Sequence, residues 1–372
     1  MEVKFPFYAK LVIILLGIVL TVVIMMEAKP VLVPLLIAGF LAVLISPFTS
    51  WMERLGFSKF LAVALSVVAL IAILTGMMFF FYNQLLGFAN DISALENRAG
   101  ELIQSLNQFL ADHVEGAVPI SMESIQNTIF QYLSENTASF TQGVIATATS
   151  LTILFIMPIY IFLFLYFRHF LVNFLLLAFA DRHRQKVQNV MNRVKSVVKN
   201  YISGMAVVIL ILAVLNSIAL FSFGIKHALL FAAFAAMLNV IPFLGPFIGS
   251  ILPIAFALLT KDSLWIPFGV FLSFYVIQVA ESNLFTPKIV GGKVSMNPLM
   301  TIIALFIGNF IWGLAGMILF IPGIAVLKVI FDEVEGMQAW GYLLGDINAG
   351  DIKKDHPSVR EHIRNVKGRF RL

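Results

Sequence analysis

Residues 228–260 form one apolar stretch of 33 residues that is broken near its middle by Pro242, Gly245, Pro246 and Gly249. A helix needs about 20 residues to cross the hydrocarbon core, so this stretch is too long for one simple crossing. Proline removes a backbone donor, glycine weakens helical preference, and lipid cannot satisfy the carbonyl groups left free. The stretch is therefore predicted to be a discontinuous membrane helix, and such breaks often line a solute or ion site.

The composition favours a membrane protein over the whole length of the chain. Of its 372 residues, 60% are hydrophobic and only 12% are charged, whereas soluble domains carry about 25% charged residues. We expect an all-α, polytopic membrane bundle of about six full spans and two interrupted or re-entrant segments. The membrane domain is predicted over residues 1–331, and a charged, partly disordered cytoplasmic tail over 332–372. The chain has no cysteine, which excludes disulfides and cysteine-ligated metals, and we expect no metal site and no cofactor.

Apolar runs of spanning length predict the full crossings. The first run is followed by Glu27, Lys29 and Pro30 rather than by a small-residue cleavage site, and the second follows at once, which indicates a retained helix rather than a signal peptide. The predicted spans cover about residues 7–26, 31–48, 60–86, 143–167, 201–223 and 264–281.

Two polar segments between spans carry opposite charge. Residues 88–142 have helical periodicity from Ile92 onward, a second short helix after Pro119, and acidic residues opposed by Arg98 alone, so we place this insert outside the cytoplasm. Residues 168–200 are basic and also keep helical spacing, which predicts a cytoplasmic helix lying along the membrane surface before the next span. Both termini are then cytoplasmic, and because topology already requires the basic charge, we expect no nucleic-acid partner.

A second overlong apolar stretch covers residues 298–330. It is broken at Gly308–Asn309 and at Gly313 to Gly316, and again at Pro322–Gly323. Each of the two stretches can be a re-entrant hairpin or a single tilted helix kinked by proline and glycine. Hairpins would place Lys288 and Lys293 in the cytoplasm, which the positive-inside rule favours slightly.

Polar residues near the breaks are the candidate pathway residues. Gln278 and Glu281 are three residues apart and share a helical face, and a carboxylate at membrane depth can exchange a proton for a cation. Alternatively, Glu281 is a helix-end residue at the interface, paired with Lys288. The candidate pathway residues are Asn239, Gln278, Glu281, Asn283 and Asn309, of which Asn239 and Asn309 can instead make packing hydrogen bonds. The residues predicted to hold the broken backbone are Pro242, Gly245, Pro246, Gly249, Gly313 and Gly316.

The run from Asn239 to Pro246, followed by Gln278-Val-Ala-Glu281-Ser-Asn283, resembles the autoinducer-2 exporter family of bacterial membrane permeases. The resemblance covers about residues 7–335 and includes the order of spans, the acidic insert and the basic helix. It implies a secondary transporter of the bacterial cytoplasmic membrane that moves solute by an elevator-like shift of one lobe. It also implies a homo-oligomer, with a pentamer as the expected form. Two substrates stay open: an autoinducer-2-type signal, or sodium (or lithium) exchanged for protons.

The resemblance and the breaks together give a mechanistic hypothesis. The two interrupted stretches face each other near the midplane, and the candidate pathway residues line a site exposed to each side in turn. The remaining spans anchor the oligomer in the bilayer.

Other classes of function leave fewer signs in the sequence. The Gly292–Lys293 pair is not a phosphate-binding loop, because Val294 follows it and no glycine stands five residues before Gly292. Serine, aspartate and zinc protease motifs are absent, so no catalytic residue and no enzyme activity are expected. A channel can also be built from broken helices. A non-transporting membrane scaffold that uses the 88–142 insert as its interaction surface is the alternative from a different class.

Overall fold

The computed structural model describes residues 6–89, 91–113, 156–179, 184–290 and 296–345. Within these ranges the chain is helical, and the only β-type pairing is an isolated antiparallel bridge between Met296 and Gly345. Six of the described helices are long and apolar enough to cross a membrane. They are α1 (Phe7–Glu27), α2 (Lys29–Arg54), α3 (Lys59–Ala89), α9 (Arg184–Ser222), α12 with its extension (Trp265–Ile289) and α15 (Leu314–Glu333). The predicted fold class, a polytopic helical membrane bundle, is confirmed.

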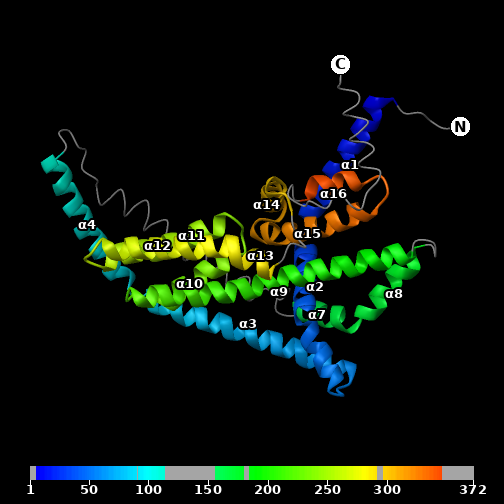
Figure 1. The fold of residues 1–372 in the computed structure, drawn as a ribbon, viewed down its shortest axis with the longest axis horizontal. Helices are drawn as coiled ribbons and strands as arrows, with labels where there is room; N and C mark the ends of the chain where they lie inside the picture. Colours follow the sequence, from blue (N-terminus) through cyan, green and yellow to red (C-terminus); the bar gives the residue numbers. More distant parts are fainter. Residues whose placement is uncertain (1–5, 90, 114–155, 180–183, 291–295, 346–372) are drawn as a thin grey trace. The chain divides into compact units, whose positions relative to one another are not determined.

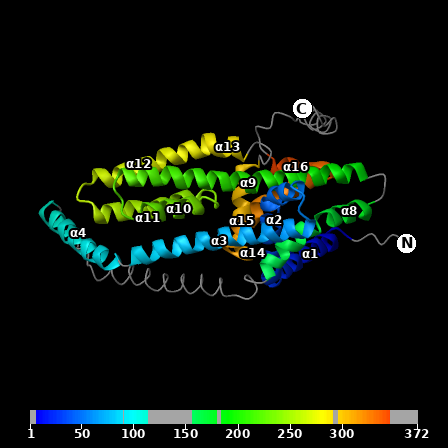
Figure 2. The same cartoon turned by 90° about the horizontal axis from the view of Figure 1, so that it is seen from below.

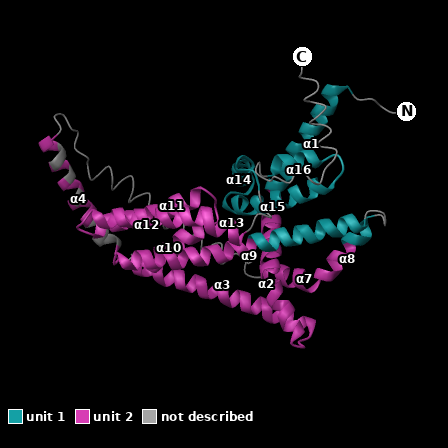
Figure 3. Cartoon of the chain, in the orientation of Figure 1, with its two compact units in different colours: residues 1–26, 175–201, 291–372 teal, residues 27–174, 202–290 magenta. Residues whose placement is uncertain are grey.

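The chain divides into two compact units (Figure 3). Unit 1 contains residues 1–26, 175–201 and 291–372, and unit 2 contains residues 27–174 and 202–290. Each unit is therefore assembled from segments that alternate along the sequence, and the single membrane domain over residues 1–331 stays a prediction.

One bundle of unit 2 packs α2, α3 and α7 (Met157–Tyr166) together. Small residues of α2, such as Ala38 and Ala42, meet branched residues of α3 and α7 in a shared apolar core. Thr49 in α2 donates to Ser66 Oγ in α3 over 2.9 Å, so the one buried polar pair in this core is satisfied internally. After α7 the chain bends by 65° into α8 (Arg168–Ala178), and Arg168 pairs with Glu53 of α2.

The other bundle of unit 2 holds the first interrupted stretch. Helices α10 (Ala228–Leu238), α11 (Leu244–Thr260) and α12 lie beside the later part of α9 (Figures 1 and 2). Their core is centred on Leu220, Phe231, Phe256 and Val270, all of which are buried. This packing positions the break between α10 and α11 next to α9 and α12.

The amphipathic helix predicted from Ile92 is α4 (Ile92–His113), and it packs on α11. Arg98 of α4 pairs with Asp262, which follows α11. Asp91, just before α4, receives Lys226 and His227 from the loop between α9 and α10. The start of the insert is thus held to unit 2 by charged contacts.

Unit 1 contains the second interrupted stretch as α14 (Pro298–Trp312) and α15, with the short helix α16 (Gln338–Leu344) packed against α15. Val197 of α9 is buried with Ala325 and Val329 of α15. Trp312 Nε1 donates to the carbonyl oxygen of Met25 over 2.8 Å, which fixes the end of α1 against α14.

Three sequence predictions differ from the structure. From Arg184 onward the basic segment and the span after it are one continuous helix, α9, so no helix end separates a surface helix from a crossing there, while residues 168–178 form α8. Pro322 lies inside α15 and does not interrupt it. The region 332–345, predicted as part of the tail, includes the end of α15 and all of α16. The second insert helix, most of the predicted 143–167 span and residues 346–372 lie outside the described residues.

Candidate functional site

Both interrupted stretches are helical hairpins rather than kinked single helices. In the first, the rings of Phe231 in α10 and Phe256 in α11 have centroids 5.1 Å apart although 25 residues separate them in sequence. In the second, Trp312 of α14 stacks edge-on against Phe320 of α15 at 5.4 Å. A continuous helix would carry such pairs many ångströms apart at about 1.5 Å per residue. The hairpin alternative is the one that the structure supports.

The turn of the first hairpin has an unusual backbone. Phe243 has φ 65° and ψ −48° and is the described non-glycine residue with positive φ. The amide of Leu244 donates to the carbonyl oxygen of Pro242 over 2.8 Å, which closes a three-residue γ-turn. The γ-turn with positive φ is rare and strained for an L-residue. Such strain tends to occur at functional sites, so the turn is a candidate for function as well as for chain reversal.

Glycines let the helices of each hairpin approach closely. A Cβ on Gly245 would overlap the backbone of Leu238, and one on Gly249 would lie 2.8 Å from Cα of Ala235. In the second hairpin, Gly313 makes the turn at φ 65°, and Gly308 and Gly316 are in backbone contact. Small residues at such contacts are the usual means of close helix packing in membranes. These close contacts support the role predicted for the glycines, holding the broken backbone, which stays a prediction.

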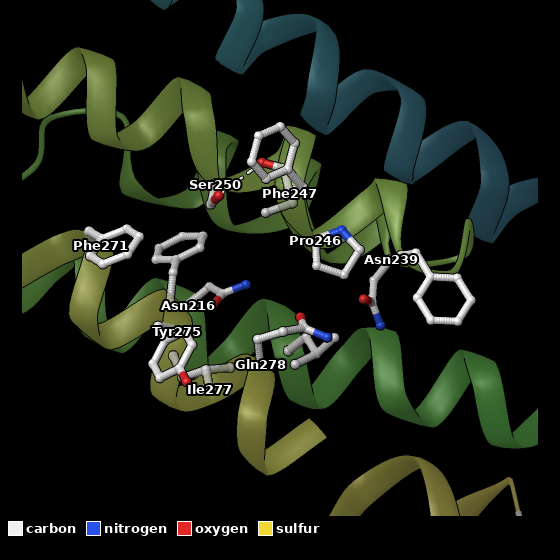
Figure 4. Close-up of a pocket in the computed structure, with 13 residues that line it drawn as sticks. Asn216, Asn239, Pro246, Phe247, Ser250, Phe271, Tyr275, Ile277 and Gln278 are labelled. Carbon is white, nitrogen blue, oxygen red and sulfur yellow. Dashed lines mark hydrogen bonds between the residues drawn. The ribbon is translucent and has the colours of Figure 1, made fainter. Parts of the chain in front are cut away.

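A cavity of about 290 Å³ lies in unit 2 beside the turn of the first hairpin (Figure 4). Helices α9, α10, α11 and α12 all contribute to it, and none of the lining residues is charged. The lining residues are Leu212, Asn216, Ala235, Asn239, Phe243, Pro246, Phe247, Ser250, Phe271, Phe274, Tyr275, Ile277 and Gln278. A mostly apolar cavity of this size with a few polar groups is typical of a small-molecule site.

Three carboxamides converge on this cavity from three elements. Asn216 comes from α9, Asn239 from the end of α10 and Gln278 from α12, and Figure 4 shows the ends of Asn216 and Gln278 directed toward the space beneath Pro246. Asn216 and Asn239 are 5% and 7% exposed. Within the described part of the chain, Asn216 Oδ1 is fully buried and has no hydrogen-bond partner. Buried polar groups are nearly always satisfied, so an unpaired carboxamide beside a cavity indicates a place for a ligand or ordered water.

Glu281 lies one turn beyond Gln278, at the start of a π-helical turn, η4 (Glu281–Phe285), that leads into α13 (Thr286–Ile289). Its side chain is buried and accepts hydrogen bonds from Gln278 Nε2 at 2.7 Å, from Ser282 Oγ at 3.2 Å and from Thr286 Oγ1. The π turn brings Thr286, five residues on, under the carboxylate. The helix continues past Glu281, and Lys288 is not among its hydrogen-bond partners, so the helix-end pairing with Lys288 is not what the structure contains.

The structure brings together some of the predicted pathway residues and not others. Asn239 and Gln278 line the same cavity, and Gln278 contacts Glu281. Asn283 is exposed and donates instead to the carbonyl oxygen of Val279. Asn309 is exposed on α14 and belongs to unit 1, whereas the cavity belongs to unit 2. A site formed by both hairpins stays a prediction.

Of the lining residues, only Asn239, Pro246 and Gln278 were predicted from the sequence. Those that were missed include Asn216, Phe243, Ser250 and Tyr275. Asn216 carries a weak signal, because it is the one carboxamide in the apolar run from 201 to 223. The other three lie in apolar or mixed surroundings, where nothing in the sequence separates a cavity wall from ordinary packing.

In unit 2, two residues at the start of the insert, Asp91 and Arg98, have shifted pKa values. Hydrogen bonds from Lys226 and then from His227 hold the pKa of Asp91 below its usual value. The carboxylates of Glu101 and Asp262 likewise raise the pKa of the Arg98 guanidinium. Among the described residues, no group of three or more His, Asp or Glu side chains is close enough together to hold a metal ion.

The helical spans, the two hairpins and the uncharged cavity are those of a multi-pass helical membrane protein. The chain belongs to the AI-2E family: the sequence model described as "AI-2E family transporter" matches residues 9–336. This is a family of transporters.

Curated bacterial relatives cover most of the chain. Two of them, YrrI and YhhT, bear the name "Putative transport protein". YrrI of Bacillus subtilis (strain 168) is 27% identical over 81% of this chain and 86% of its own length. YhhT of Escherichia coli (strain K12) is 24% identical over 91% and 92%. The protein named AI-2 transport protein TqsA of Escherichia coli (strain K12) is 20% identical over 86% and 91%.

Proposed function

We propose that this protein is a secondary transporter that exports a small signalling molecule of the autoinducer-2 type. The observation that carries the proposal is the uncharged cavity at the turn of the first hairpin, where three carboxamides meet aromatic side chains. A solute with several hydroxyl groups and no net charge suits such a lining, because each carboxamide can both donate and accept. Membership of the AI-2E family and the name of TqsA support the choice of solute.

In the proposed mechanism, the cavity opens to each side of the membrane in turn through an elevator-like movement. The existence of two compact units supports a mechanism in which one part of the chain carries the solute and another stays fixed. Asn216, Asn239 and Gln278 hold the solute. Pro242, Gly245, Pro246 and Gly249 shape the turn and touch the solute mainly through backbone.

The test is flux of labelled autoinducer-2 in proteoliposomes that contain the purified protein. Asn239→Ala removes one of the three carboxamides and should slow flux several-fold. Ser217→Ala is the matched control, because Ser217 donates to the carbonyl oxygen of Ala213 and does not line the cavity. Equal flux with wild-type and empty liposomes would overturn the proposal.

A sodium or lithium/proton antiporter is the second candidate, and the buried Glu281 favours it. A carboxylate at membrane depth is costly and commonly takes part in ion or proton movement. The test is proton movement across the liposome membrane when sodium or lithium is added. A response that is lost in Glu281→Gln would support this candidate, while a response of equal size in the variant would exclude Glu281 from the exchange.

We also propose a homo-oligomer, a pentamer in its expected form, in the bacterial inner membrane with both termini in the cytoplasm. The basic residues of 168–200 support the orientation. Because the chain has no cysteine, single cysteines introduced at Gln185 and at Glu101 can be labelled with an impermeant reagent. Native mass spectrometry of the detergent-solubilised protein reports the number of subunits.

A further inference from the structure

Gln278 belongs to two sites at once. Its side chain lines the cavity, and its Nε2 donates to Oε2 of Glu281 over 2.7 Å. No hydrogen bond holds its carbonyl oxygen within the described chain. A carboxamide has a donor end and an acceptor end, so whichever end faces Glu281 decides which end the cavity receives.

The hydrogen bonds that the described residues donate to the Glu281 side chain all come from neutral groups. Its hydrogen bonds come from Gln278, Ser282 and Thr286, and no ion pair of the described residues includes it. The other helices that line the neighbouring cavity add no charge: residues 202–222 of α9 and all of α10 and α11 lack Asp, Glu, Lys, Arg and His. On its own helix, the nearest titratable groups are Tyr275 and Lys288.

Gln278 and Thr286 donate to the two oxygens of this carboxyl group, and the Ser282 hydroxyl can donate either to it or to the backbone carbonyl oxygen of Gln278. This arrangement corresponds to the ionised form, because a carboxylate only accepts hydrogen bonds. A protonated carboxyl group needs an acceptor for its own hydrogen. Rotation of the Gln278 carboxamide by half a turn supplies the carbonyl oxygen as that acceptor. The same rotation turns the NH₂ group toward the cavity.

We propose that Gln278 couples the protonation of Glu281 to solute binding, so that a proton and the solute compete for the protein. With Glu281 ionised, the cavity receives the carbonyl oxygen of Gln278, which accepts a hydroxyl of the solute. With Glu281 protonated, the cavity receives a second donor in its place, and the solute is bound less tightly. This inference rests on the proposed function, since the competing solute is the exported molecule.

Mutual exclusion of solute and proton is the condition for antiport. A carrier that binds either a proton or the solute can return inward with the proton after releasing the solute outside. By linkage, if protonation weakens solute binding by a given factor, bound solute weakens proton binding by the same factor. Solute binding therefore releases the proton. An inward proton gradient would then drive export.

The first test is calorimetry of autoinducer-2 binding to the detergent-solubilised protein, in buffers of different ionisation heat. Wild type should release protons on binding. In the pH range where Glu281 is mostly protonated, its Kd should rise by up to about tenfold for each unit by which the pH falls. Glu281→Gln and Gln278→Leu should both bind without proton release, and their Kd should no longer depend on pH. Glu101→Gln, which removes an exposed carboxylate of α4, should behave as wild type.

Binding by wild type without proton release, or proton release that persists in Glu281→Gln, would overturn the coupling while leaving the transport proposal intact. Absence of autoinducer-2 binding would instead overturn the proposed function.

Infrared difference spectra between high and low pH then decide the coupling without a solute. A carboxyl band that disappears in Glu281→Gln should be accompanied by a shift of a glutamine side-chain band, lost in Gln278→Leu. A carboxyl band with no glutamine shift overturns the proposal.

Discussion

Gly308 and Gly316 are in direct backbone contact across the second hairpin, so closely that a Cβ on Gly316 would overlap the carbonyl oxygen of Gly308. The contact sets the distance between α14 and α15, and it explains why a stretch of spanning length folds back on itself. It also makes a substitution series possible, because α15 contains another glycine, Gly323, with open space around its Cβ position.

Gly316→Ala should lower the melting temperature of the detergent-solubilised protein. The added methyl group has to separate the two helices, and overpacking of this kind costs about 1–3 kcal/mol. Gly323→Ala should be neutral or slightly stabilising, since alanine has the higher helix propensity by about 1 kcal/mol. Differential scanning fluorimetry on the two variants checks this, and an equal melting temperature for both would contradict the contact.

Asn216→Leu should stabilise the fold and weaken solute binding at the same time. Its buried Oδ1 has no partner among the described residues, and an unsatisfied buried acceptor costs about 1–3 kcal/mol. Leucine has the same number of side-chain heavy atoms in a similar branched shape, and the adjoining cavity can take its larger methyl groups, so it removes that cost together with a solute-binding group. The melting temperature and the Kd for autoinducer-2 are measured on one preparation, with Ser217→Ala as control. A variant that loses stability would show that Asn216 is a structural residue.

Asp91 should make stability depend on pH in the acid range. Its pKa is lowered in the folded protein by Lys226 and His227, so its contribution is fully present above the unfolded pKa of about 3.9 and is lost as the pH falls through the folded value. Asp91→Asn should therefore melt below wild type at pH 7, and the difference should shrink below about pH 4. Asp112→Asn, an exposed change in α4, should show no such dependence.

Thr286→Val should slow transport several-fold, because it removes the hydroxyl that the π turn at 281–285 brings under Glu281. Valine has the branched shape of threonine, so the change removes a donor to the carboxylate with little change in packing. Asn283→Ala is the control, since Asn283 is exposed and donates to the carbonyl oxygen of Val279. Flux of labelled autoinducer-2 in proteoliposomes checks this, and equal flux in the two variants would contradict a role for the Thr286 hydroxyl.

Much of the fold can be read from the sequence because lipid imposes strict rules. Apolar runs predict the spans, and the glycines and prolines at 242–249 and 313–316 predict the positions where the chain reverses. The prediction failed at α9, where the change from basic to apolar residues near Tyr201 suggests a boundary. A helical backbone satisfies its own hydrogen bonds in water and in lipid alike, so a change of environment does not require a change of conformation.

The candidate site could be predicted only in part. The three-residue spacing of Gln278 and Glu281 indicates that they share a helical face, and in the structure the two side chains are hydrogen-bonded. Asn216 was missed because α9 is apolar on all sides after residue 201, so no periodicity shows which face a lone asparagine occupies. Asn283 does not line the cavity, and local spacing could not show that a π turn follows Ala280; its place in a solute pathway stays a prediction.

The positive φ of Phe243 is a matter of chirality. Its backbone conformation is one that a D-residue would adopt without penalty, and the chain holds an L-residue in it at the wall of the cavity. This strain raises the free energy of the observed turn, so the free-energy difference between it and other conformations of the same residues is smaller. The turn is thus the part of the hairpin that costs least to rearrange, and the cavity beside it can change shape while the helices on either side stay intact.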